Sequence, residues 1–368
     1  MKIIFRTDAS LEIGTGHVIR CLTLANILKR LGWQCKFICR EHHGNLVDHI
    51  RSCGYDVGVL PIANNDLVIK KTGSEKRSNY SKWLGSDWRI DAEQTKICIG
   101  GEVVDWLIVD HYAIDIRWES ELRDVCHRLM VIDDLANRRH DCDILLDQNL
   151  GRIEFDYAQL TSENCLILLG PNYALLRSEF HQLRKCSLKR RTIPKMEHLL
   201  ISMGGVDKSN TTEHILETLK SCKLPSELRI TVVMGIHAPW LNRVQLCATK
   251  MPYLTEVKVN VTNMAKLMTI SDLAIGAAGS ASWERCCLGL PSLIKINADN
   301  QLHIANALQK MGAAKIFTER EGVGTLPTVI TKLVDNTQAL SDLSRISSKI
   351  TDGYGTRRVS EYLVRIKN

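Results

Sequence analysis

A histidine preceded by two closely spaced glycines lies at the end of the first expected strand. The segment "RTDASLEIGTGHVIRCLTLANILKRLG" places Gly14, Gly16 and His17 where that strand turns into a helix. Glycines at such a turn let a phosphate or another ligand group come close to the backbone. A dinucleotide fingerprint would need a third glycine at the position of Ile19. The motif is therefore not a dinucleotide-binding fingerprint, and the turn is expected to have another role.

The chemistry open to His17 is that of a general base. The positive end of the helix dipole disfavours an imidazolium at this position. A neutral imidazole can accept a proton from water, and the two glycines would keep its surroundings free of side chains. The alternative is a structural histidine at a helix start.

A second strand-to-helix turn occurs in "GAAGSASWERCCLGLP". The backbone N–H groups that begin the helix after Gly279 and Ser280 suit a diphosphate. Glu284 falls on the first turn, where its carboxylate could accept from the hydroxyl pair of a ribose. An ordinary turn with a favourable first-turn charge is the alternative. "SMGGVDKSN" is a parallel but weaker case, because a lone pair of glycines is common in turns.

Further polar side chains end two apolar runs in the first half of the chain: Asp110, His111, Tyr112, Asp133 and Asp134. Aspartates at strand ends are mostly turn formers, so a ligand role for any one of them is the minority reading. Asp141 and Asp143 in "HDCD" have the spacing of a metal–diphosphate motif. They precede a strand instead of following one, so a structural role is expected, and no metal or cofactor is predicted.

Composition narrows the class of protein. The 368 residues are 45% hydrophobic and 24% charged, and the net charge of +7 is modest and scattered. This suits an enzyme with an anionic small substrate better than a nucleic-acid binder. No apolar segment approaches the ~20 residues of a membrane helix, and no signal peptide is expected. The odd count of 13 cysteines predicts reduced thiols in the cytoplasm.

Short apolar strands alternate with helical patterns along the chain, as in parallel sheets covered on both faces. Ala63 to Gly85 is polar and mixed, which predicts a surface excursion, and "RKCSLKRR" at Arg184 to Arg191 predicts a solvated linker. The pattern restarts after it. We therefore expect two doubly wound domains, residues 1–190 and 191–368, facing across a cleft that holds the ligand.

Taken together, six segments resemble one family, the UDP-sugar hydrolase of pseudaminic acid biosynthesis. They are "DASLEIGTGHVIRCLTLA", "VDHYAIDIRWE", "VIDDLANRRHDCDILLDQN", "LLGPNYALLR", "SMGGVDKSN" and "GAAGSASWERCCLGLP". The resemblance runs from about Phe5 to Ala313 and implies an α/β GT-B fold of two Rossmann-like domains. It extends to the peptidoglycan N-acetylglucosaminyltransferase, which has a similar glycine-rich loop and histidine. Two parts of the chain, Ala63 to Lys82 and the tail after Thr318, resemble nothing in the family.

The resemblance also implies roles for individual residues. His17 would be the catalytic base that activates water, in the domain that holds the sugar side of the cleft. The C-terminal domain would bind UDP. The substrate-binding residues implied in this way are Asp8, Gly14, Gly16 and Arg20 around His17; Tyr173, Arg177, Asn300 and Gln301 at the sugar; Gly204, Gly205, Gly279 and Ser280 at the phosphates; Asn263 and Met264 at uracil; and Glu284 at the ribose.

The reaction so implied is hydrolysis of UDP-2,4-diacetamido-2,4,6-trideoxy-β-L-altropyranose at the anomeric carbon, with inversion, by a monomer without metal. The nearest alternative is a GT-B glycosyltransferase that gives the sugar to an acceptor. A third reading is a non-catalytic UDP-sugar sensor, which would have no need of His17. No nucleic-acid or membrane partner is expected.

Overall fold

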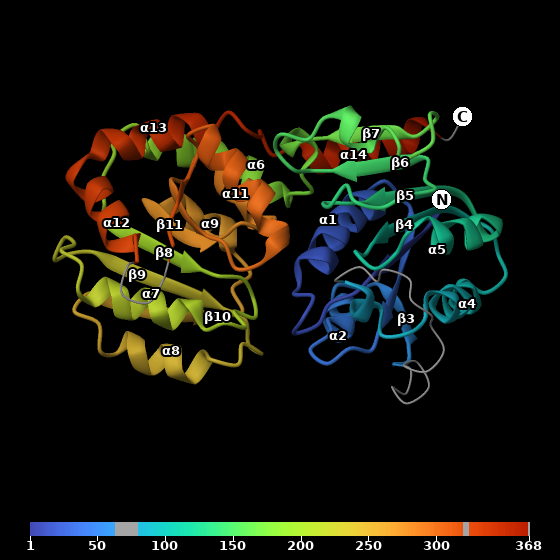
Figure 1. The fold of residues 1–368 in the computed structure, drawn as a ribbon, viewed down its shortest axis with the longest axis horizontal. Coiled ribbons are helices and arrows are strands. Elements are labelled where there is room, and N and C mark those ends of the chain that lie inside the picture. Colours follow the sequence, from blue (N-terminus) through green and yellow to red (C-terminus); the bar gives the residue numbers. More distant parts are fainter. Residues whose placement is uncertain (63–79, 319–323, 367–368) are drawn as a thin grey trace. The chain divides into compact units, whose positions relative to one another are not determined.

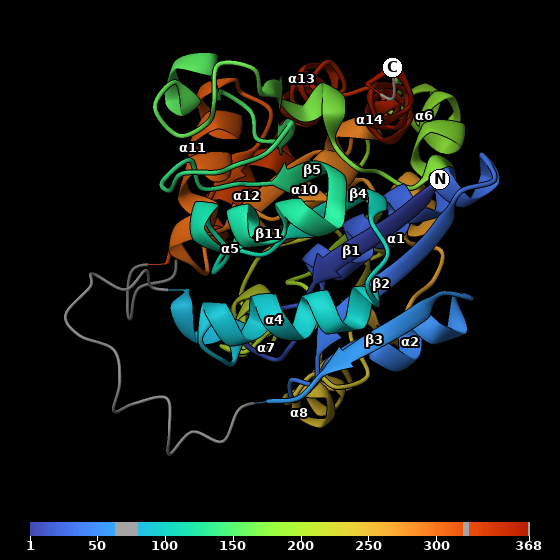
Figure 2. The ribbon, with the colours of Figure 1, turned by 90° about the vertical axis from the view of Figure 1, so that its right-hand side faces the viewer.

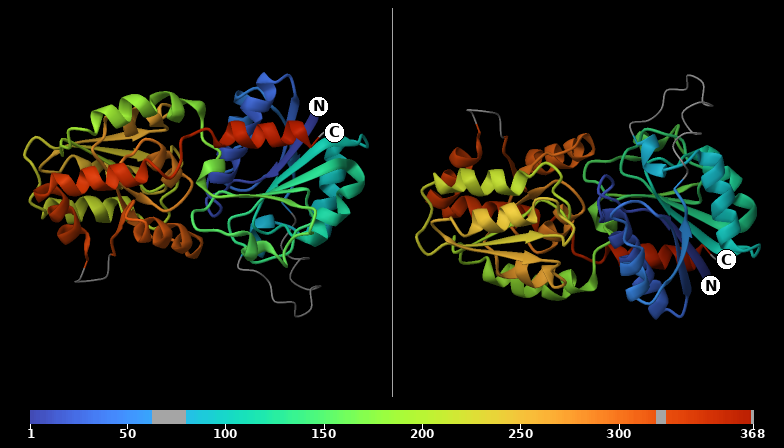
Figure 3. Two further views of the ribbon diagram at one scale, coloured as in Figure 1. Left: turned by 90° about the horizontal axis from the view of Figure 1, so that it is seen from above. Right: turned by 90° about the horizontal axis from the view of Figure 1, so that it is seen from below.

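The computed structural model describes residues 1–62, 80–318 and 324–366, and these form two compact units. The first unit comprises Met1–Leu175 together with Thr356–Asn368, and the second comprises Leu176–Gly355. This division differs from the expected boundary at residue 190. The first unit ends earlier, and the C-terminal segment returns to it, so that the N terminus and the last helix belong to the same unit (Figure 3).

A seven-stranded, fully parallel sheet forms the centre of the first unit (Figure 1), with the order β3-β2-β1-β4-β5-β6-β7. Its strands are β1 (Lys2–Thr7), β2 (Gln34–Arg40), β3 (Asp56–Leu60), β4 (Val104–Asp110), β5 (Cys126–Ile132), β6 (Ile144–Asp147) and β7 (Leu166–Leu169). Most of these strands are buried on both faces, which explains why they read as near-continuous apolar runs.

Helices cover both faces of this sheet. One apolar cluster joins the strands to α1 (Gly16–Arg30), α2 (Val47–Ser52) and α14 (Gly355–Arg365). A second cluster joins the other face to α4 (Trp88–Ile99) and α5 (Ile116–Glu121), which lie in front of the strands in Figure 2. The described part of this unit also contains the 3-10 helices η1 (Ser81–Leu84), η2 (Arg123–Val125), η3 (Glu154–Tyr157) and η4 (Pro171–Tyr173).

The second unit repeats this architecture with a six-stranded parallel sheet of order β10-β9-β8-β11-β12-β13. Its strands are β8 (His198–Ser202), β9 (Arg229–Met234), β10 (Leu254–Val259), β11 (Leu273–Ala277), β12 (Ser292–Lys295) and β13 (Lys315–Ile316). The main core packs α7 (Thr211–Lys220), α8 (Leu241–Ala248), α12 (Leu326–Asp335) and α13 (Thr337–Ser347) against the strands. The remaining elements are α6 (Ser178–Arg190), α9 (Met264–Ile270), α10 (Ala281–Cys287), α11 (Leu302–Lys310) and the 3-10 helix η5 (Asp299–Gln301).

The basic run from Arg184 to Arg191 is not a solvated linker, and that prediction is wrong. Most of it lies in α6, where its arginines bind other parts of the second unit. Arg184 donates to the carbonyl oxygens of Cys287 and Ser348. Arg190 pairs with Asp272 at 2.5 Å, and Arg191 donates to backbone carbonyls near the end of α9. The positive charges therefore fix this helix to its own unit.

Among the described residues, none of the helices combines the length and apolar character that crossing a bilayer requires.

Candidate active site

The turn before α1 is set by backbone conformation. Gly14 adopts a φ of +80°, in the left-handed region, and its N–H donates to the carbonyl of Ser10 at 2.9 Å. The Ser10 hydroxyl accepts from the backbone N–H groups of Glu12 and Ile13. A Cβ placed on Gly14 would meet no atom within 4 Å, so its conformation, and not crowding, requires glycine here.

His17 is the second residue of α1, and its side chain is only 9% exposed. Its Nδ1 lies 2.6 Å from Oδ1 of Asp110, the last residue of β4. A carboxylate can only accept, so Nδ1 carries the proton and donates it. The other ring nitrogen, Nε2, is then the basic one, in the tautomer that a general base needs.

Arg20 fixes the carboxylate that orients His17. Its Nε and Nη2 atoms donate to the two oxygens of Asp110, each at 2.6 Å. Burial opposes ionisation of Asp110, but Arg20 and His17 outweigh it and hold the pKa of that carboxyl well below its ordinary value. Arg20 also donates to Asp134 at 2.7 Å, and Asp134 accepts from the Tyr112 hydroxyl at 2.8 Å. Asp110 is thus a fixed, ionised partner for His17.

Sheet order brings these residues together. His17 follows β1, Asp110 ends β4, and Asp134 follows β5, and these three strands are neighbours in the sheet. Because the carboxyl ends of parallel strands meet at one edge, the three side chains converge there.

Asp8 contacts a different set of residues from those around His17. Its side chain is fully buried. One carboxylate oxygen accepts from the Arg40 backbone N–H at 2.6 Å and pairs with Arg6 at 2.7 Å. The other oxygen lies 3.3 Å from Nε2 of His111. These partners enclose the Asp8 carboxylate, and its expected contact with substrate stays a prediction.

Two aromatic rings contact His17, and a third packs against both of them. The ring of Tyr112 meets the imidazole edge-on, with centroids 4.6 Å apart, and Trp83 stacks on Tyr112 at 5.6 Å and 19°. Tyr80 meets both of these rings edge-on, at 4.8 Å from Trp83 and 5.1 Å from Tyr112. Trp83 itself is 6.4 Å from the imidazole.

The glycine turn after β8 in the second unit is closely packed against the end of β9. Gly204 has a φ of +99° and Gly205 is exposed. The N–H of Gly235 donates to the carbonyl of Gly205, and a Cβ on Gly235 would come within 2.3 Å of that oxygen. The carboxylate of Asp207 accepts from the first N–H groups of α7, so the helix start itself is already capped.

The other expected nucleotide residues also follow strands of this sheet. Gly279 and Ser280 follow β11, and Asn300 and Gln301 follow β12. These strands neighbour each other, and β11 also pairs with β8, so the three loops share one edge of the sheet. A Cβ on Gly279 would meet no atom within 4 Å, which leaves open space at this turn.

Glu284 and Arg177 lie in one electrostatic cluster of the second unit. Burial raises the pKa of Glu284 to about 7, although Arg177 and Arg285 act in the opposite direction. Arg177 pairs with Glu179 at 3.1 Å and donates to the carbonyl of Thr262, which precedes Asn263 and the start of α9. The structure therefore brings the predicted ribose residue close to the predicted uracil segment.

Several known proteins are similar to this chain, although no protein-family model matches it. It is 28% identical to the UDP-2,4-diacetamido-2,4,6-trideoxy-β-L-altropyranose hydrolase of Campylobacter jejuni over 85% of this chain and 97% of that protein. It is 26% identical to an uncharacterized protein of Methanocaldococcus jannaschii over 80% of this chain, and this match spans only 55% of that relative's length.

Solved structures resemble the whole chain. MurG of Acinetobacter baumannii aligns over 99% of both chains with a TM-score of 0.66 and 17% identity. LpCGTa in complex with UDP aligns over 99% of this chain and 98% of that one, with a TM-score of 0.64 and 13% identity. The chain has the GT-B fold. The fold class predicted from the sequence is confirmed.

The boundary between the two units falls between two residues that the resemblance places at the sugar. Arg177 belongs to the second unit, whereas Tyr173 belongs to the first. The Tyr173 ring packs near Tyr362 of α14, with centroids 6.2 Å apart. Gln301 accepts from the backbone N–H of Asn297 within its own loop, and Asn300 is half-buried.

Sequence reasoning missed part of the site. Asp110, Tyr112 and Asp134 were considered only as strand ends, and their position after neighbouring strands was the available signal. Trp83 and Tyr80 fall in the segment from Ala63 to Gly85, whose polar composition predicts a surface excursion and not a site. Residues 63–79 of that excursion lie outside the described residues. For residues 80–85, the pair of aromatic residues in "YSKWLG" was the feature of the sequence that could have indicated a place in the site.

Asp141 and Asp143 have partners that account for both side chains. Arg123 contacts them at 2.7 and 2.6 Å, and Asp143 also accepts from the backbone of Leu129. This agrees with the structural role expected for "HDCD".

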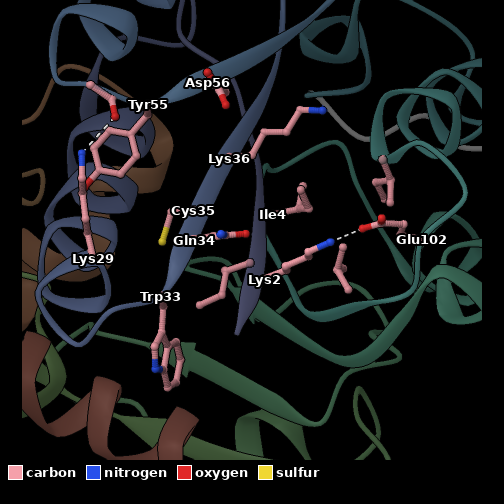
Figure 4. Close-up of a pocket in the computed structure, with 14 residues that line it drawn as sticks. Lys2, Ile4, Lys29, Trp33, Gln34, Cys35, Lys36, Tyr55, Asp56 and Glu102 are labelled. Carbon is pink, nitrogen blue, oxygen red and sulfur yellow. Dashed lines mark hydrogen bonds and ion pairs between the residues drawn. The ribbon is translucent and has the colours of Figure 1, made fainter.

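A hollow of about 560 Å³ opens at the opposite end of the first sheet, where its strands begin (Figure 4). Three lysines line it, but each amine already has a partner: Lys2 contacts Glu102, Lys29 the carbonyl of Gly54, and Lys36 that of Cys98. Because the hollow lies where the strands begin and His17 lies where they end, the two are separate.

Proposed function

We propose that this protein hydrolyses UDP-2,4-diacetamido-2,4,6-trideoxy-β-L-altropyranose to UDP and the free sugar. The observation that carries the proposal is the fixed pair of His17 and Asp110 at the carboxyl end of the first sheet. The similarity to the Campylobacter jejuni hydrolase over nearly all of that protein supports the choice of substrate. At a coarser level, the comparisons support an enzyme that acts on a UDP-sugar.

In this reaction, His17 accepts a proton from water at Nε2 while Nδ1–H stays bonded to Asp110. The water oxygen forms a bond to the anomeric carbon. The bond from that carbon to the diphosphate oxygen breaks, and its electron pair leaves with UDP. Arg20 keeps Asp110 ionised, so that Asp110 can stabilise the imidazolium that forms.

The second unit would hold the nucleotide. Backbone N–H groups at Gly279 and Ser280, with the turn at Gly204 and Gly205, would bind the diphosphate and stabilise the charge of the leaving group. Glu284 would accept from the ribose hydroxyls. Asn263 and Met264 would contact uracil. Asn300, Gln301 and Arg177 would face the sugar, as would Tyr173 of the first unit.

The bond that breaks distinguishes this proposal from phosphorus chemistry. Attack at the anomeric carbon, opposite to the leaving group, inverts the configuration there. In water enriched in ¹⁸O, the new label should appear on the sugar and not on UDP, and the first anomer formed should be inverted. Label on UDP would show attack at phosphorus and would contradict the proposed mechanism.

A GT-B glycosyltransferase is the alternative activity. The same base would then deprotonate an acceptor hydroxyl in place of water. The test is to follow UDP release by the purified protein with the diacetamido sugar nucleotide, with and without added acceptors. Release that is independent of acceptor supports the hydrolase, and release that requires one supports the transferase. No UDP release with any donor would support the sensor reading.

A further inference from the structure

The segment around η1 places a tryptophan next to the proposed base. Trp83 is half-buried, stacks on Tyr112 and lies 6.4 Å from the imidazole of His17. Tyr80, also half-buried, contacts both rings. Trp83 thus presents a half-buried ring next to the hydrogen-bonded chain of His17, Asp110 and Arg20.

This segment is held firmly in place. Leu84 is 2% exposed and packs in the same apolar cluster as α4 and α5. Gly85 ends η1 in the left-handed region with a φ of +68°. A Cβ at Gly85 would come within 2.7 Å of the His42 ring and 2.8 Å of the Arg40 side chain, so the turn fits closely against β2 and the loop that follows it. Trp83 thus has a defined position beside His17.

We propose that Trp83, with Tyr80 beside it, forms an aromatic wall that recognises the apolar parts of the sugar at His17. The inference rests on the proposed function. A sugar with a methyl group at C6 and two acetamido groups has three methyls that water solvates poorly. Aromatic faces contact such groups favourably because the contact removes apolar surface from water. Trp83 would therefore select substrates by sugar structure, and the nucleotide would bind independently of it.

The first experiment compares Trp83→Ala with Trp83→Phe and with a matched control, Trp88→Ala. Trp88 is also half-buried in the first unit, but its ring lies under the guanidinium groups of Arg89 and Arg117. The measured quantities are KM and kcat for the diacetamido-trideoxy sugar nucleotide and for UDP-N-acetylglucosamine, and the inhibition constant of UDP.

We expect Trp83→Ala to raise KM for the trideoxy substrate about tenfold, the loss that fits two methyl groups left in water. The inhibition constant of UDP should stay at its wild-type value, and the preference over UDP-N-acetylglucosamine should fall. Trp83→Phe should recover most of the preference. If Trp83→Ala and Trp88→Ala give the same KM and preference while the wild type is active, the aromatic wall is refuted and the proposed function stands.

The second experiment does not depend on turnover. Saturation-transfer-difference NMR with the free diacetamido-trideoxy sugar should show transfer to its methyl protons in the wild type and in Trp88→Ala. The transfer should be lost in Trp83→Ala. Absence of methyl transfer in the wild type, or equal transfer in Trp83→Ala, overturns the inference. A wild type that binds the sugar in this way but releases no UDP would instead overturn the proposed hydrolysis.

Discussion

The Nδ1 atom of His17 lies 2.6 Å from Oδ1 of Asp110, although 93 positions separate the two residues along the chain. The contact exists because β1 and β4 are neighbours in a parallel sheet, so that the loop after one meets the end of the other. Arg20, one helical turn after His17, completes the arrangement by binding both oxygens of Asp110. The base His17 and the cation Arg20 thus come from the helix that follows β1, and the orienting carboxylate of Asp110 comes from the end of the neighbouring strand β4.

Replacement of His17 by asparagine should abolish turnover and leave UDP affinity nearly unchanged. Loss of a general base typically costs on the order of 10²–10⁴ in rate. UDP release measures the first effect and titration calorimetry with UDP the second. His49→Asn, at an exposed position in α2, is the matched control. Full activity of His17→Asn would remove the basis of the proposed mechanism.

Asp110→Asn should reduce kcat by about 10³–10⁴ while the protein remains folded, as for the equivalent change in a serine-protease triad. An asparagine amide can donate to Nδ1, which would place the imidazole proton on Nε2 and leave no basic nitrogen for water. Asp105→Asn, at the other end of β4, is the control. Thermal unfolding should be measured for both variants. Equal rates for the two would contradict the role of Asp110 in fixing the tautomer.

The affinity for UDP should depend on the ionisation of Glu284. Its pKa of about 7 means that the free protein carries a neutral carboxyl below that pH. Ribose hydroxyls donate best to the ionised form. The affinity should therefore fall by up to about tenfold for each pH unit below 7, beyond the change that UDP's own titration causes.

Glu284→Gln separates these two contributions, because it removes the titration of residue 284 but keeps that of UDP. Calorimetry from pH 5.5 to 8.5 should show a weaker pH dependence in this variant than in the wild type or in Glu217→Gln, an exposed control. Glu284→Ala should bind UDP at least tenfold more weakly at pH 8. Identical pH profiles for the wild type and Glu284→Gln would refute the ribose contact.

Turnover should persist in a chelator. Asp141 and Asp143 have the spacing of a diphosphate-metal motif, but both bind Arg123 and lie before β6. The leaving charge would be stabilised by backbone N–H groups instead. The check is UDP release after dialysis against EDTA, with and without added Mg²⁺ or Mn²⁺. A large loss that either ion restores would show that the reaction requires a cation.

The sheets could be predicted from the sequence because strands buried on both faces leave an unambiguous mark. "DWLIVD" is such a run, and it forms β4. The linker predicted from Arg184 to Arg191 was wrong because its sequence pattern is ambiguous. Its charge pattern is the same in a solvated linker and in a helix whose arginines bind carbonyls, and only the partners, Cys287 and Ser348 among them, distinguish the two.

The site was predictable where its residues are close in sequence and less so where they are distant. His17 and Arg20 share one helix, and the family resemblance implied that they lie together. Asp110 required the strand order β1-β4, which no local pattern contains. The burial of Asp8 was not predictable, because the sequence does not show which side chains at a strand end are enclosed. The arrangement of the two units across a cleft stays a prediction.

The return of the chain to its first unit affects the order in which the protein can be completed during synthesis. Val359 and Leu363 of α14 are fully buried in the core that β1 and α1 begin. A ribosome that has made the first 175 residues has therefore produced a sheet with one face still partly uncovered. The second unit is continuous in sequence and can close its own core first. The first unit can complete its core only after α14 has been made, and until then the apolar surface that α14 covers lacks this partner.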